Sequence, residues 1–276
     1  MKEVDLPSLA SFIEAPFQFQ QGESPLLISM PHCGLNLTAT VKKALTEKAK
    51  CLPDTDWYIP EIYGNLAECG VSVISANYSR YVIDLNRSYD DEALYTTKTT
   101  GLFPEILFDE SPIFLPDKIP SDTHRSLCKT QIWLPYHQQI ERELARIKAK
   151  YGFAIVLDAH SIAAEVPMLF EGVLSDFNWG TNAGASCHPA LLNSAQACLS
   201  SDYNQIANGR FKGGYITRRF GQPHIGIHAI QLELSQATYL NNDLAKQQQY
   251  VLDEKKLPVI QKQLRTLVDT LLTLKL

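Results

Sequence analysis

The sequence predicts an α/β protein, a three-layer α/β/α arrangement with a mainly parallel mixed sheet between two layers of helices. Short apolar runs of the strand type alternate with amphipathic helical patterns along the 276-residue chain. This alternation is typical of parallel sheets whose connections are helices. Several of the apolar runs end in polar residues, as strands do when they carry functional side chains to the carboxyl edge of an open sheet.

Five short runs rich in aliphatic residues are the predicted strands, at residues 25–32, 71–75, 81–86, 153–161 and 227–234. Four of them finish on polar side chains, namely His32, Asn86 with Arg87, His160 with Ser161, and Glu233. Because the carboxyl ends of parallel strands meet at one edge of a sheet, we expect these side chains to lie close together.

Four segments have the apolar spacing of amphipathic helices, at residues 38–50, 56–69, 130–150 and 254–275. The first begins on a threonine cap, and the second runs from Asp56 to a Cys-Gly stop. Residues 90–128, rich in Thr, Pro and Asp, form the main irregular stretch. Irregular connections of this length are often functional, so we expect a lid or wall over the site.

Composition narrows the classes of function. An apolar fraction of 45% and a charged fraction of 20% are those of a soluble globular protein, and we expect one domain over residues 1–276. The net charge of −5 gives no basic face for nucleic acid. No apolar stretch approaches a membrane span, and the first residues lack a signal-peptide core. Six scattered cysteines without a CxxC pair indicate reduced thiols and a cytoplasmic protein.

Two strand-end histidines, His32 and His160, are candidate metal ligands, because neutral imidazole is a favoured zinc ligand. A third ligand could come from Asp54, Asp56 or Asp158. The first two also suit the cap of a helix. Asp158 lies two residues before His160 on the same strand face, so it could instead orient a ligand.

Glu233 interrupts an apolar run close to the end of its strand, on the same face as Gln231. This pattern suits a solvent-exposed edge face, or a general base beside a metal site.

Basic residues form a second group of candidates. Arg80 and Arg87 flank the predicted strand at 81–86, and residues 208–221 carry a further cluster that comprises Arg210, Lys212, Arg218 and Arg219. In an acidic protein such clustering favours an anionic ligand, since arginine binds carboxylates through two parallel hydrogen bonds.

A serine or cysteine hydrolase is a weaker alternative. Cys33 adjoins His32 and Ser161 adjoins His160, but neighbours on a strand point to opposite faces. No GxSxG elbow is present either.

The segment SRYVIDLNRSYDD (79–91) resembles the N-formylglutamate amidohydrolases, together with MPHCG, DTDW, LDAHS, LFEG, NGRFKGGYITRRFG and HAIQLEL. The resemblance extends from about residue 25 to about residue 240. Some of these motifs are also similar to those of the aspartoacylases and, more distantly, of the zinc carboxypeptidases.

This resemblance implies a carboxypeptidase-like fold and a zinc-dependent amidohydrolase that converts N-formyl-L-glutamate to glutamate and formate, the last step of the five-step histidine degradation route. It implies that His32 and His160 bind zinc. In the HxxE motif of the related families a glutamate follows three residues after the first histidine, where this chain has Leu35. Asp56 is therefore the candidate for the third ligand.

The same resemblance implies roles for the remaining candidates. Glu233 corresponds to the catalytic glutamate, and Arg80 to an arginine that polarises the scissile carbonyl. Asn86 and Arg87 correspond to the pair that holds a substrate carboxylate. The chemistry of the second carboxylate points to two further arginines, Arg210 and Arg218. Another N-acyl amino acid, a short acidic peptide, or non-catalytic binding of an anionic metabolite remain alternatives.

Overall fold

A seven-stranded sheet forms the centre of the computed structural model, which describes residues 14–64, 66–93 and 99–276. The order of the strands is β1-β3-β2-β4-β7-β5-β6. Their bounds are β1 Phe17–Gln20, β2 Leu26–Met30, β3 Ser72–Ala76, β4 Ala154–Ile162, β5 Phe177–Gly180, β6 Gln205–Ala207 and β7 Ile227–Ser235.

The middle of the sheet is parallel. Strands β3, β2, β4 and β7 run in the same direction, whereas β1 pairs antiparallel with β3 and β5 pairs antiparallel with β7. Strand β6 pairs parallel with β5. In the β4–β7 register His160 lies opposite Glu233. Two residues that the sequence predicted to meet at the carboxyl edge are thus neighbours across adjacent strands.

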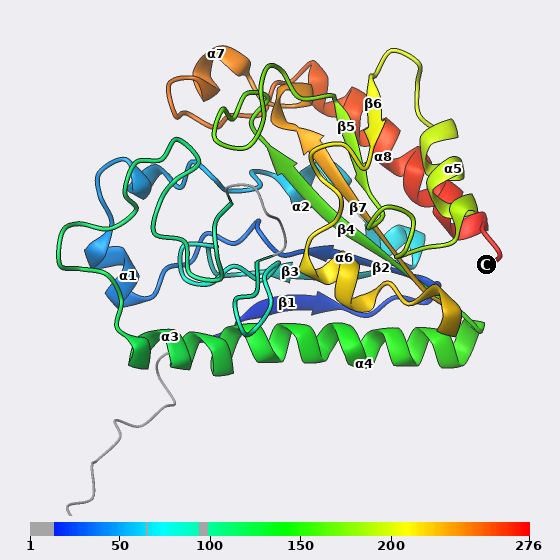
Figure 1. The fold of residues 1–276 in the computed structure, drawn as a ribbon. Coiled ribbons are helices and arrows are strands. Elements are labelled where there is room, and N and C mark those ends of the chain that lie inside the picture. The colour runs from blue at the N-terminus through cyan, green and yellow to red at the C-terminus, as the bar shows by residue number, and fades with distance from the viewer. Residues whose placement is uncertain (1–13, 65, 94–98) are drawn as a thin grey trace, which may run out of the picture.

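Helices cover both faces of the sheet, as Figure 1 shows. The long helix α4 and the short α6 pack against one face, and α2, α5 and α8 cover the other. Among the described residues, no helix combines the length and the apolar character needed to cross a membrane. The helix bounds are α1 Ala39–Ala44, α2 Ile59–Tyr63, α3 Asp122–Cys128, α4 Leu134–Tyr151, α5 Pro189–Ala197, α6 Tyr215–Phe220, α7 Asn242–Ala245 and α8 Lys256–Thr273.

Two apolar clusters, one on each side of the sheet, form the core. All nine residues of β4 are buried, because this strand has helices over both faces and strands on both edges. Such burial explains why its sequence reads as an almost continuous apolar run rather than as an alternation. The predicted three-layer α/β/α class is confirmed.

The predicted strand at 81–86 is wrong. The segment forms a buried series of turns, in which Val82 N donates to Ser79 O and Asp84 N donates to Leu102 O at 2.8 Å. Its aliphatic residues pack into the core beside the sheet without joining it. Burial alone produces an apolar run, so the pattern did not distinguish a packed loop from a strand.

The predicted helices have different bounds in the structure. The one at 38–50 is helical over α1 and again as a 3₁₀ turn at Ala49–Cys51. The one at 56–69 divides at Gly64, whose φ of +68° ends α2. The one at 130–150 begins earlier, with α3 and a π-helical turn at Lys129–Trp133 that leads into α4.

The irregular stretch at 90–128 contains residues 94–98, which lie outside the described part of the chain. Of the remainder, Thr99 and Phe108 line the pocket at the edge of the sheet. Its last residues are the helix α3. The described part of the stretch therefore provides a wall of the site.

Candidate active site

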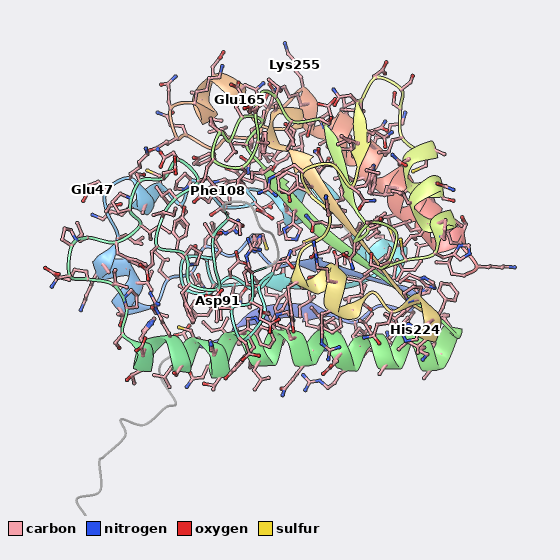
Figure 2. All side chains as sticks on the ribbon, viewed as in Figure 1. Glu47, Asp91, Phe108, Glu165, His224 and Lys255 are labelled. Atoms are coloured by element: carbon pink, nitrogen blue, oxygen red, sulfur yellow. The ribbon has the colours of Figure 1, made fainter. Side chains whose placement is uncertain are left out.

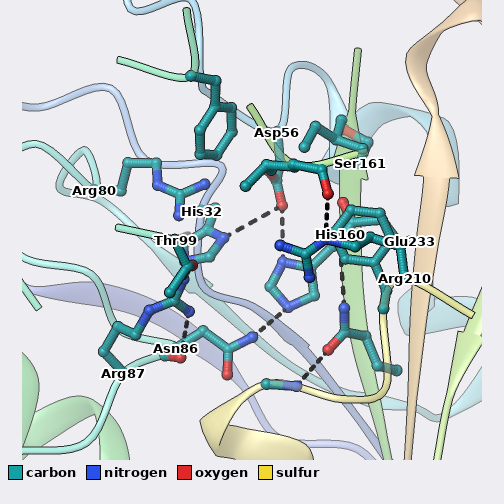
Figure 3. Close-up of a pocket in the computed structure, with 16 residues that line it drawn as sticks. His32, Asp56, Arg80, Asn86, Arg87, Thr99, His160, Ser161, Arg210 and Glu233 are labelled. Atoms are coloured by element: carbon teal, nitrogen blue, oxygen red, sulfur yellow. Dashed lines mark hydrogen bonds and ion pairs between the residues drawn. The ribbon is translucent and has the colours of Figure 1, made fainter. Parts of the chain in front are cut away.

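A pocket lies at the carboxyl edge of the parallel strands (Figure 3). Its lining comes from segments far apart in the sequence, including the ends of β2, β4 and β7 and the loops around residues 80–108 and 210–214. The lining residues that the sequence proposed as functional are His32, Asp56, Arg80, Asn86, Arg87, His160, Arg210 and Glu233.

Local structure explains how the three potential ligands reach this pocket. His32 lies two residues beyond the end of β2, and His160 projects from β4 near its carboxyl end. Asp56 lies in the turn before α2, and its backbone N donates to the His32 carbonyl at 3.1 Å. That hydrogen bond joins the two loops and places the Asp56 carboxylate between the two imidazoles.

His32, Asp56 and His160 form a compact buried cluster, in which one potential ligand atom of each lies within 4.8 Å of the others. Asp56 Oδ2 lies 3.8 Å from His32 Nδ1 and 3.0 Å from His160 Nδ1. Ligands at zinc bond lengths in a tetrahedron are separated by about 3.4 Å. These two separations lie on either side of this value, and the cluster as a whole spans up to 4.8 Å, so small side-chain shifts would let the three groups share one divalent ion.

The outer nitrogen of each imidazole faces a carboxylate. His32 Nε2 lies 2.7 Å from Asp84 Oδ1, and His160 Nε2 lies 3.1 Å from Asp158 Oδ1. Asp158 Oδ1 is buried and has no hydrogen-bond partner in the described part of the chain. A carboxylate behind the ligating histidine is the usual arrangement at metal sites, since it fixes the tautomer and the ring orientation.

The charges around the cluster also suit a cation. Burial and the Arg80 charge lower the pKa of His32, which keeps this ring in the neutral form that binds metals. Burial opposes a charge on His160, but Asp158 and Asp56 outweigh it and hold the pKa of His160 well above its ordinary value. The two carboxylates thus favour positive charge at this position, which a proton or a metal ion can supply.

The three candidate aspartates occupy different positions. Asp56 lies inside the cluster. The Asp54 carboxylate instead accepts a hydrogen bond from Phe108 N at 3.2 Å, which fixes the loop at the edge of the pocket. Asp158 lies behind His160 and accepts hydrogen bonds from Asn86 and Thr217. The geometry therefore favours Asp56 over the other two as the carboxylate of the candidate metal cluster.

Glu233 projects into the pocket from β7 and is 7% exposed. Gln231 Nε2 donates to its Oε2 at 3.1 Å, which orients the carboxylate. Burial raises the pKa of Glu233 to about 8, against the opposing charge of His160. A carboxylate with a raised pKa in a cleft matches the requirements of a proton carrier near neutral pH.

Three of the four candidate arginines line the pocket, and they approach from different loops. Arg80 is buried, and its Nη2 donates to Asp84 Oδ2 at 2.6 Å. Arg87 donates to Thr100 O, Asn86 O and Thr99 Oγ1, and a guanidinium carries five N–H donors in all. Arg210 Nε donates to the Leu169 carbonyl.

Arg218 is not brought to the pocket with the other three. It lies in α6 near the chain reversal at Gly213, and its Nε donates to the Gly213 carbonyl at 2.8 Å. It is not among the residues that line the pocket.

Both polar atoms of the Asn86 side chain contact protein groups. Its Nδ2 lies 2.9 Å from His160 Nε2 and 3.2 Å from Asp158 Oδ2, and its Oδ1 accepts from Ile216 N. A Cβ at Gly214 would approach Asn86 Nδ2 to 2.3 Å, so the loop before α6 packs directly on this amide. Asn86 thus connects His160 to the start of α6.

Asp84 is a central residue that the sequence reasoning missed. It is fully buried and accepts hydrogen bonds from Arg80 and from Asn86 N in addition to facing His32. Burial disfavours its charge, but His32, Arg80 and Arg87 hold its pKa well below the ordinary value. An acid within the aliphatic run YVIDLN was the available signal, and the strand prediction for that run obscured it.

The nucleophile alternatives have other partners in the structure. Ser161 Oγ accepts a 2.7 Å hydrogen bond from Tyr239, so its hydroxyl is engaged with that residue rather than with the imidazole of His160. Burial raises the pKa of the Cys33 thiol to about 12, and its Sγ donates to the Met30 carbonyl. A thiol with so high a pKa is not an activated nucleophile.

Known proteins share the sequence and the fold. The sequence pattern of the N-formylglutamate amidohydrolase family matches residues 24–240. An N-formylglutamate deformylase from Pseudomonas aeruginosa is 52% identical over 225 residues, covering 81% of this chain and 85% of that protein. Another, from Pseudomonas putida, is 48% identical over 246 residues, covering 86% and 92%.

A solved structure agrees in fold. The crystal structure of N-formylglutamate amidohydrolase from Ralstonia eutropha superposes with a TM-score of 0.79 at 22% identity, covering 94% of this chain and 96% of that one. The match over residues 24–240 and the two relatives at 52% and 48% identity establish that the chain belongs to the N-formylglutamate amidohydrolase family.

Proposed function

We propose that this protein hydrolyses the formyl amide of N-formyl-L-glutamate to glutamate and formate, which would be the last step of the histidine degradation route. Two relatives that are 52% and 48% identical to this chain are N-formylglutamate deformylases. The observation that carries the proposal is the convergence, in one pocket, of the His32–Asp56–His160 cluster, the buried Glu233 and three arginines.

His32 Nδ1, Asp56 Oδ2 and His160 Nδ1 are the atoms that would hold a divalent metal ion, for which zinc is the first candidate. When bound, the ion would supply Lewis acidity and make a water molecule more acidic. Asp84 would hold a proton on Nε2 of His32, which leaves the lone pair of Nδ1 free for the ion.

Glu233 acts as the proton carrier of the reaction. Its carboxylate takes a proton from the attacking water as the new C–O bond forms at the formyl carbon. It then delivers that proton to the amide nitrogen as the C–N bond breaks, so that glutamate leaves as the amine and formate as the acid. The hydrogen bond from Gln231 holds the carboxylate in place for both transfers.

Arg80 stabilises the negative charge that develops on the carbonyl oxygen, and Asp84 holds its guanidinium in position. Arg87 and Arg210 bind the two substrate carboxylates, because they line the pocket from opposite loops and the substrate is a dianion. Asn86 contributes by holding His160 and the start of α6, since its amide atoms are engaged with those groups. Arg218 would hold the loop before α6 through its hydrogen bond to the Gly213 carbonyl, and would not contact the substrate itself.

A hydrolysis assay with N-formyl-L-glutamate, run with metal analysis on the same samples, tests the proposal. We expect turnover in the wild type, and in Glu233→Gln we expect a fall of at least 10²-fold with the metal content unchanged, as for loss of a general base. Glu254→Gln is the matched control at an exposed site. Wild-type protein that binds the dianion without releasing formate would instead support the non-catalytic alternative.

A further inference from the structure

A second cavity adjoins the pocket, and the two share part of one wall. The pocket has a volume of about 60 Å³ and the second cavity about 170 Å³. Phe108, Ser161 and Ile162 line both. The second cavity in turn adjoins a third of about 500 Å³, with Pro53 and Tyr250 common to their linings.

The second cavity begins beside the His32–Asp56–His160 cluster. Its lining includes Asp54 and Thr55, just before Asp56, and Ser161 and Ile162, just after His160. Figure 3 shows Asp56 and Ser161 on one side of the His160 ring, with Asn86 and Arg87 on the other.

This placement gives the substrate a direction. With a glutamate carboxylate on Arg87 and the amide carbonyl at the cluster, the acyl substituent extends away from Arg87. In formyl that substituent is a single hydrogen. Any larger group must extend toward the wall that separates the pocket from the second cavity.

Phe108 is the bulky side chain of that wall, and two contacts hold it. The Arg80 guanidinium lies 4.9 Å from the centroid of its ring, and its backbone N donates to the Asp54 carboxylate. Figure 2 shows Phe108 among the loops beside the edge of the sheet. Arg80 and Asp54 are themselves buried or half-buried, so the ring has little freedom to move aside.

We propose that Phe108 determines acyl specificity, and that the second cavity is an acyl subsite that this ring closes. The inference rests on the proposed function, because it assumes that the amide carbonyl lies at the cluster. Removing the ring joins the two cavities and opens room for an acyl chain of several carbons.

The charges of the second cavity specify which acyl groups would enter. Its lining includes Asp54, Glu165 and Asp109, the last of which pairs with Lys48, and no lysine or arginine is among the described residues that line it. Neutral acyl chains should therefore be accepted better than chains of equal length that end in a carboxylate. The opened subsite should thus favour N-butyryl-L-glutamate over N-succinyl-L-glutamate.

The experiment compares kcat/KM for N-formyl-, N-butyryl- and N-succinyl-L-glutamate in wild type and Phe108→Ala. We expect the butyryl-to-formyl ratio to rise at least tenfold, since one methylene in a fitted pocket changes discrimination by about 10- to 200-fold. The factor by which the succinyl-to-formyl ratio rises should be at least threefold smaller than the factor for the butyryl-to-formyl ratio. Using ratios removes any general loss of rate caused by the missing contact with Arg80.

Phe103→Ala is the matched control. Phe103 lies in the same segment, is also half-buried, and has the Arg125 guanidinium 5.3 Å from its ring centroid, but it lines neither cavity. Its substrate ratios should equal those of the wild type. Phe108→Leu, which leaves more of the wall packed, serves if Phe108→Ala does not fold, and its butyryl-to-formyl ratio should rise at least threefold.

Calorimetric binding of N-butyryl-L-glutamate separates the two possible failures. If wild type hydrolyses N-formyl-L-glutamate but the folded Phe108 variants keep wild-type ratios, the inference is wrong and the proposed function stands. If wild type hydrolyses none of the substrates, the proposed function is wrong. In that case, if Phe108→Ala binds the butyryl compound at least tenfold more tightly than wild type does, the assignment of Phe108 as the wall between the two cavities would still be supported. Unchanged binding would overturn that assignment.

Discussion

The buried carboxylate of Asp84 gives the sharpest test of how this site is held together. Asp84 accepts hydrogen bonds from Arg80 Nη2 at 2.6 Å and from Asn86 N at 2.8 Å, and its Oδ1 lies 2.7 Å from His32 Nε2. Replacement by asparagine keeps the shape but removes the charge and puts an amide N–H₂ where one of the acceptors was. Arg80 or His32 then loses its partner inside the protein.

The expected loss of stability in Asp84→Asn follows from those contacts. Removing one partner of a buried ion pair costs about 3–5 kcal/mol, because the remaining charge is left buried without compensation. With an m value of about 3 kcal/mol/M in urea, the midpoint of unfolding of Asp84→Asn should fall by about 1 M or more. Loss of the carboxylate behind a ligating histidine should also weaken metal binding by about 10- to 100-fold.

Urea unfolding and competition with a chelator for zinc measure the two effects separately. Asp117→Asn, at an exposed position, is the control and should leave both quantities unchanged. If Asp84→Asn unfolds at the wild-type urea concentration and also binds zinc with wild-type affinity, the role assigned to this carboxylate is wrong.

The remaining predictions concern substrate binding, pH and metal. Arg87→Ala should lower kcat/KM for N-formyl-L-glutamate at least tenfold, since hydrogen bonds between charged groups contribute about 1.5–3 kcal/mol; an unchanged value, as expected for the exposed Arg219→Ala, would exclude the carboxylate role. Burial lowers the pKa of His137 from 6.5 to about 3. Between these values the unfolded chain binds a proton that the folded chain excludes. The free energy of unfolding should therefore fall by up to about 1.4 kcal/mol for each pH unit between pH 6.5 and 3. Urea unfolding from pH 7 to 5 should therefore show a shallower loss in His137→Gln, which keeps a donor for the Leu85 carbonyl, than in wild type or the exposed control His224→Gln, and equal slopes would contradict it. Dialysis against a chelator should lower the melting temperature and added zinc should restore it, because an ion that binds only the folded state stabilises that state; a melting temperature indifferent to both would argue against a metal.

The fold class could be predicted because its signals are local. The apolar runs of β2, β4 and β7 and the amphipathic pattern of α8 each depend on neighbouring residues along the chain. The segment at 81–86 carried a similar apolar signal but packs as buried turns. Burial produces such a run in either conformation, and only hydrogen bonds to distant residues such as Leu102 decide between them.

The candidate site could be predicted in part for the same reason. Polar residues at strand ends identified His32, His160 and Glu233, because parallel strands present their carboxyl ends at one edge. The resemblance already favoured Asp56, and the structure supports that choice over Asp54 and Asp158 because only the Asp56 carboxylate lies in the cluster with both imidazoles. Asp84 was missed because an acid in a buried loop shows its purpose only through the partners around it.

The sequence by itself determined the alternation of strands and helices, the kinds of chemical groups available and the resemblance to one family. The tertiary structure alone decided which groups share a site: that Asp56 lies between two imidazoles, that Asn86 supports His160, and that Arg218 lies outside the pocket. The physical reason is one of range. Backbone preferences act over a few residues, whereas coordination and charge pairing act over a few ångströms between residues that can be a hundred positions apart.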